Sequence, residues 1–73
     1  MRTTIFSRVL VDKLNEAYNQ FPKLGTVELT ETGELREVFC RLWFPGPLIF
    51  EATGIGALKA LETAVTIARR SLN

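Results

Sequence analysis

One stretch of the sequence decides the fold: Val38-Phe39-Cys40-Arg41-Leu42-Trp43-Phe44-Pro45-Gly46-Pro47-Leu48-Ile49-Phe50-Glu51-Ala52. Its first half contains the β-branched Val38 and three aromatic residues, which favour strands. Pro45-Gly46-Pro47 interrupts the pattern, because proline and glycine are strong turn formers. We therefore predict a strand over 35–44, a sharp turn, and a short strand over 48–52.

The residues before this stretch predict a helix and a first strand. Apolar residues recur every three or four positions, as on one face of a helix: Phe6, Leu10, Leu14, Ala17 and Phe21. Ser7 is a suitable N-cap, and Pro22 ends the helix. From Thr26 to Thr30 the period changes to two, which predicts a strand, and Gly33 supplies the positive φ of the turn that follows.

The residues after the stretch predict a long final helix over 57–72, entered through a turn at Thr53-Gly54-Ile55-Gly56. Two neighbouring apolar stripes run along it: Leu58, Leu61, Val65, Ala68 and Leu72, and Ala57, Ala60, Ala64 and Ile67. A wide apolar face of this kind packs flat on a sheet. We expect a single α+β domain over residues 1–73, of order α-β-β-β-α. Its three-stranded antiparallel sheet should carry both helices on one face.

The composition argues against most enzymes. The chain has no histidine, one cysteine and one aspartate. It therefore offers no Ser-His-Asp or Cys-His set, no pair of carboxylates in an apolar setting and no cluster of metal ligands. We expect a non-enzymatic binding module that needs no cofactor or metal and has no small-molecule substrate.

Several features favour a cytoplasmic protein without a membrane segment. The apolar runs fall far short of the roughly 20 residues that span a bilayer, and Asp12 and Lys13 interrupt any signal-peptide core at the start. Cys40 stands alone in an apolar run and suits a reducing compartment. The formal net charge of +1 gives no strong field toward nucleic acid or membranes.

The alternation of the second strand predicts a binding surface on the open side of the sheet. The apolar parity, Val38, Cys40, Leu42 and Phe44, should face the helices, which leaves the other parity exposed. The exposed set predicts an apolar centre with a charged rim, the usual anatomy of a protein interface, for a partner or a second copy: Phe39, Arg41, Trp43, Ile49, Glu28 and Glu51. Two other interpretations stay open: Trp43 is covered by the chain ends or by Pro45 and Pro47, or it stacks single-stranded RNA together with Phe39.

The element order resembles the double-stranded-RNA-binding domain over about residues 7–72. The aromatic-rich second strand, the third strand, the turn Gly54-Ile55-Gly56 and the alanine-rich helix carry the resemblance. The family grips RNA through its first helix, its first strand loop and a Lys-Lys-x-Ala-Lys box. Here the box reads Leu58-Lys59-Ala60-Leu61-Glu62, and the loop Glu31-Thr32-Gly33-Glu34 carries two carboxylates. The resemblance implies the family's fold with a degenerate RNA-binding box, since phosphate contacts need cations.

Two alternatives remain beside a protein-binding module of regulatory or accessory type. One is nucleic-acid binding, of structured RNA, through the basic positions Lys23, Lys59, Arg69 and Arg70. The other is a weaker resemblance to HicB-type antitoxins, carried by Phe44-Pro45-Gly46 and Ala57-Leu58-Lys59-Ala60-Leu61 and covering only the second half of the chain.

Overall fold

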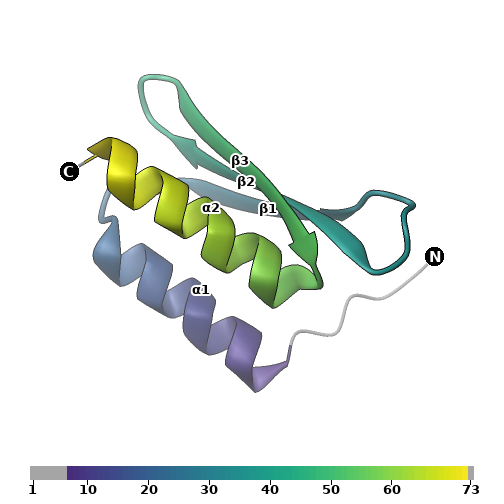
Figure 1. Cartoon of the computed structure of the whole chain (residues 1–73). Helices are drawn as coiled ribbons and strands as arrows, with labels where there is room; N and C mark the ends of the chain where they lie inside the picture. Colours follow the sequence, from purple (N-terminus) through teal and green to yellow (C-terminus); the bar gives the residue numbers. More distant parts are fainter. Residues whose placement is uncertain (1–6, 73) are drawn as a thin grey trace.

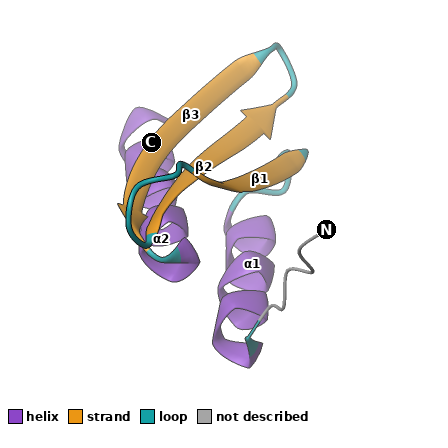
Figure 2. Ribbon diagram, turned by 90° about the vertical axis from the view of Figure 1, so that its right-hand side faces the viewer, coloured by secondary structure: helices purple, strands orange, loops and turns teal. Residues whose placement is uncertain are grey.

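The computed structural model describes residues 7–72, which form a helix, three strands and a second helix (Figure 1). The elements are α1 (Arg8–Gln20), β1 (Thr26–Glu31), β2 (Glu37–Phe44), β3 (Leu48–Ile55) and α2 (Ala57–Leu72). The strands form one antiparallel sheet in the order β1-β2-β3. Figure 2 shows both helices on the same side of this sheet. The predicted α+β class and α-β-β-β-α order are confirmed.

Helix α1 begins and ends where the sequence predicts. The Ser7 side chain accepts a hydrogen bond of 3.1 Å from the Leu10 N–H, which satisfies a free donor of the first turn. The Phe21 N–H donates to the Ala17 carbonyl at 2.9 Å, and the helix stops before Pro22. Leu10 and Ala17 are the buried residues of its apolar stripe. Phe6, which the sequence places first in that stripe, lies outside the described residues.

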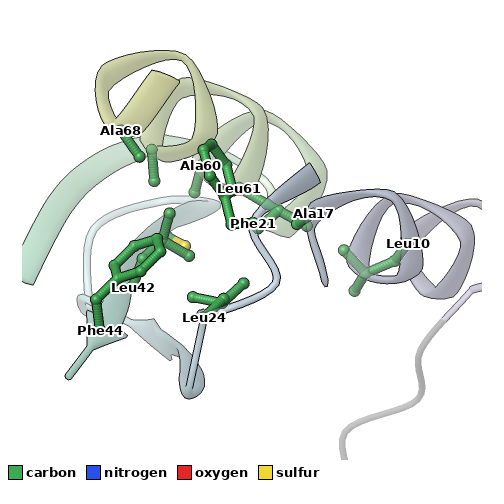
Figure 3. Packing of buried hydrophobic residues seen from close by; sticks show 11 residues of the cluster. Leu10, Ala17, Phe21, Leu24, Leu42, Phe44, Ala60, Leu61 and Ala68 are labelled. Atoms are coloured by element: carbon green, nitrogen blue, oxygen red, sulfur yellow. The ribbon is translucent and has the colours of Figure 1, made fainter. Parts of the chain in front are cut away.

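The central strand β2 buries the parity that its sequence predicts. Cys40 and Leu42 have no exposed surface, and Phe44 is also buried. The Phe44 ring meets the rings of Phe21 and Phe50 edge-on, with centroids 5.6 and 5.7 Å away. Figure 3 shows Leu42 and Phe44 pointing from the strand toward the residues of both helices. A strand paired on both sides thus supplies the centre of the core.

Helix α2 lies on the sheet through three alanines and one leucine, and not along the whole of either predicted stripe. Its buried residues are Ala60, Leu61, Ala64 and Ala68. Leu72 is 44% exposed and Ile67 38% exposed, so the two predicted stripes are only partly correct. Alanines let the helix backbone come close to β3. A Cβ added at Gly54 would lie only 2.7 Å from the Ala60 nitrogen, which makes glycine the residue that fits there.

Two predicted strand boundaries are wrong. The second strand begins at Glu37 and not at Leu35, because Arg36 has a φ of 59° and Leu35 is 87% exposed in the turn. The third strand does not end at Ala52 but continues to Ile55. The turn into α2 is therefore confined to Gly56, whose φ is 89° and whose N–H donates to the Arg36 carbonyl at 2.8 Å.

The contact between β3 and α2 can be tested with Gly54→Ala. The added methyl group would meet backbone atoms of Lys59 and Ala60, which cannot move aside as a side chain can. Overpacking of this kind typically costs about 1–3 kcal/mol. We expect a loss of that size in the free energy of unfolding, measured by urea denaturation. Thr53→Ala is the control, since the neighbouring Thr53 is exposed, and a loss there as large as that of Gly54→Ala would contradict the explanation.

Candidate functional site

The side of the sheet away from the helices presents a regular grid of side chains, which we call the open face. The strand register places Glu28, Arg41 and Glu51 side by side across the three strands. One neighbouring row contains Thr30, Phe39 and Thr53, and the other contains Thr26, Trp43 and Ile49. A fourth position pairs Glu37 with Ile55. The sequence-predicted residues of the open face are thus all brought together, because opposite residues of an antiparallel pair share a face.

Arg41 is the centre of the open face, so the predicted apolar centre with a charged rim is wrong: the charged row lies between the rows of Trp43 and Phe39. Its Nε donates a hydrogen bond of 2.8 Å to Glu51, and its Nη1 lies 3.7 Å from Glu28. Its guanidinium carbon lies 5.1 Å from the centroid of the Phe39 ring and 5.4 Å from that of Trp43. Guanidinium groups favour both carboxylates and aromatic faces. One side chain therefore holds together members of all three strands.

The open face exposes apolar side chains to solvent. Ile49 is 40% exposed and Ile55 65% exposed, whereas Phe39 and Trp43 are partly buried, with Arg41 against both rings. The sequence predicts a turn at Ile55, which is wrong, because Ile55 is the last residue of β3. Ile55 lies two residues after Thr53, so the two residues share a face if the strand continues through Gly54. That spacing is the signal in the sequence that places Ile55 on the open face.

The predicted basic residues do not form one patch. Lys23 and Arg69 both line an apolar groove of about 450 Å³ that also contains the Phe21 and Phe44 rings. Lys59 lies ten positions before Arg69 on α2, which corresponds to about 15 Å along the helix axis. Arg70 is exposed and lies about 100° around the helix from Arg69. The structure therefore brings Lys23 and Arg69 together and leaves Lys59 apart.

Cys40 lies on the helix side of β2 and is no part of the open face. Its burial removes water from the thiolate and raises the pKa of the thiol from 9.0 to about 11. The protonated thiol is a poor nucleophile. Cys40 thus acts as a small apolar residue of the core.

The raised pKa of Cys40 predicts a pH dependence of stability. The unfolded chain loses the thiol proton near pH 9.0, whereas the folded chain keeps it up to about 11. Below pH 9 the thiol is protonated in both states, and its contribution to the free energy of unfolding is fully present. Between pH 9 and about 11 the unfolded chain binds fewer protons than the folded chain. The free energy of unfolding should therefore fall by roughly 1.4 kcal/mol per pH unit in that window.

Urea unfolding from neutral pH to just below pH 11 measures this dependence. Cys40→Ala is the reference, because it lacks the thiol but keeps every other titratable group. The slope attributed to the thiol is the difference between wild type and Cys40→Ala. Equal slopes for the two proteins would contradict the assignment. A thiol reagent should also react with the folded protein far more slowly than with the unfolded one.

Neither helix of residues 7–72 is long and apolar enough to cross a membrane. Within the same residues, no group of three acidic or cysteine side chains is arranged to hold a metal ion. Comparison with family models, curated proteins and solved structures found no match.

Proposed function

We propose that this protein is a non-enzymatic binding module and that its open face binds another protein. The observation that supports the proposal is the position of Arg41, held between two aromatic rings and two carboxylates in the middle of an uncovered sheet. Tryptophan and arginine are enriched at the energetic centres of protein interfaces. Both are present here, and the exposed Ile49 lies opposite Trp43 in the strand register.

The charges of the open face favour a protein over a nucleic acid. Glu28 and Glu51 flank Arg41 on both sides, so the central row has more negative than positive charge. A phosphate backbone would meet these carboxylates at short range, and phosphate contacts provide most of the affinity for nucleic acids. A protein surface that offers basic or hydroxyl groups to this row, and apolar side chains to the neighbouring rows of Trp43 and Phe39, complements the open face.

We also propose a fold family and a cellular compartment for this protein. The confirmed order α-β-β-β-α supports a fold of the double-stranded-RNA-binding type whose RNA-contacting box is degenerate. Within this proposal, the protein has a regulatory or accessory role in the cytoplasm. The free, buried thiol of Cys40 supports a reducing compartment.

Trp43→Ala tests the open face directly. The substitution removes an aromatic ring from the uncovered side of the sheet, so we expect the chain to stay folded by circular dichroism. Loss of an aromatic hot spot typically costs about 2 kcal/mol or more, which corresponds to a loss of affinity of roughly 30-fold.

Immobilised wild type and Trp43→Ala are compared for the proteins that they retain from an extract of the source cells, and retained species are then titrated individually. Leu35→Ala is the matched control, because it shortens an exposed apolar side chain in the turn before β2. A partner should be lost by Trp43→Ala and kept by Leu35→Ala. Equal retention by all three proteins would overturn the proposal.

The placement of Lys23 and Arg69 at one groove favours a second candidate function, binding of structured RNA. Under this alternative, Lys23→Glu and Arg69→Glu abolish RNA binding in a filter or fluorescence titration, and added salt weakens the binding of wild type steeply. Trp43→Ala would leave it unchanged. The two candidates therefore predict opposite responses from the same set of variants.

A further inference from the structure

The outer edge of β3 lacks the features that usually prevent edge strands from pairing. β3 is eight residues long, lies at the end of the sheet, and pairs with no other strand than β2 within residues 7–72. It has no proline and no lysine, and Glu51 is its only charged residue. The Glu51 carboxylate is already bound by Arg41 at 2.8 Å. The opposite edge, β1, is shorter and carries two acidic residues, Glu31 and Glu28, the second of which Arg41 also contacts. Charged edges of this kind resist pairing.

Exposed apolar side chains gather along the same edge. Leu48, Ile49 and Ile55 of β3 are 40%, 40% and 65% exposed. On α2, Ile67 is also exposed, and it lies about 150° around the helix from Glu62 and Arg69. Glu62 and Arg69 contact Lys13 and Gln20 of α1. Ile67 therefore lies on the side of α2 turned away from α1, and α2 packs against β3 and β2.

We infer that a second copy of this chain pairs with the β3 edge in antiparallel orientation. The result is a continuous six-stranded sheet with four helices on one face. This inference goes beyond the proposed function, because it uses the backbone edge of the sheet, whereas the partner of the proposed function binds the open face.

The side chains of β3 select one register for this pairing. The helices of both copies share a face only when residues of the same parity stand opposite each other. Glu51 opposite its own copy would place two like charges together, which is unfavourable. The next register places Ala52 on the two-fold axis, Glu51 opposite Thr53, and Ile49 opposite Ile55. It pairs the two exposed isoleucines of the edge in both halves of the dimer.

The same arrangement brings the two α2 helices into contact. Strands of a sheet are about 4.8 Å apart. A helix over β2 and β3 would therefore lie about 10 Å from its copy, close to the distance of packed helices. Ile67 and the small Thr63 would then lie in the groove between them. Edge pairing thus covers apolar surface of both the strand and the helix.

Charge substitutions at the paired isoleucines test the interface. Light scattering should give wild type twice the mass of one chain. Ile49→Lys/Ile55→Lys places lysine opposite lysine across the axis, so this double variant should be a folded monomer, and so should Ile49→Glu/Ile55→Glu. An equimolar mixture of the two variants should recover the dimer, which a general loss of folding would not produce. Leu35→Lys, which removes exposed apolar surface elsewhere, should remain a dimer.

Cysteine cross-linking tests the register. Both cysteine variants are made in a Cys40→Ala background, because Cys40 lies directly opposite Ala52 on β2 and would compete for a disulfide within one chain. Ala52→Cys places the two Cα atoms opposite each other, about 4.5–5.5 Å apart and within disulfide range, whereas Thr53→Cys places them roughly 8 Å apart. Mild oxidation should link the first variant and largely spare the second, and the Cys40→Ala background alone should stay unlinked. Preferential linkage of Thr53→Cys would overturn the register.

The outcomes separate this inference from the proposed function. A wild-type monomer in the high-micromolar range would overturn edge pairing and leave the open face unaffected. A dimer that Trp43→Ala dissolves, but the double lysine variant does not, would also overturn edge pairing, and it would place self-association on the open face. A dimer that persists in Trp43→Ala and is lost in the double lysine variant supports the edge, whatever the open face binds. A dimer that persists in both variants would overturn edge pairing.

Discussion

The strict alternation of β2 is the constraint on which the rest of the structure depends. Because the strand is paired on both sides, each of its residues must face either the helices or the open face. Cys40 and Leu42 are completely buried on one side, while Arg41 forms its contacts on the other. A shift of one residue would bury the guanidinium and expose the core. The core and the candidate site are therefore specified by the same eight residues.

The sequence predicted the element order and the open face because both follow from local patterns. Period two in β2 and the stops at Pro22 and Pro45 are visible without any tertiary information. The missed features depend on contacts between distant residues. β3 continues through Gly54 because its backbone pairs with Val38 and because α2 needs the missing side chain for a close approach. Nothing in the local sequence distinguishes such a glycine from one in a turn.

The dependence on contacts between distant residues also explains why the buried residues of α2 were predicted only in part. Leu58 and Leu72 have the spacing of a buried stripe, yet of that stripe Leu61 and Ala68 are the buried members, together with Ala60 and Ala64 of the neighbouring stripe. Periodicity reports which side of a helix is apolar, but not how far the helix lies from the sheet. The separation of Lys59 from Lys23 and Arg69 is also a property of packing, since it depends on which end of α2 lies beside the end of α1.

The Arg41 network affects the binding properties of the open face in two ways. Covering Arg41 and its two carboxylates with a partner removes them from water, a cost that their mutual attraction only partly offsets. Such a row contributes more to the choice and orientation of a partner than to affinity. Affinity must then come from the apolar rows beside it. In the paired sheet, Ile55 of the second copy lies beside Ile49 in the row of Trp43. Edge pairing would therefore enlarge the apolar surface that gives the open face its affinity.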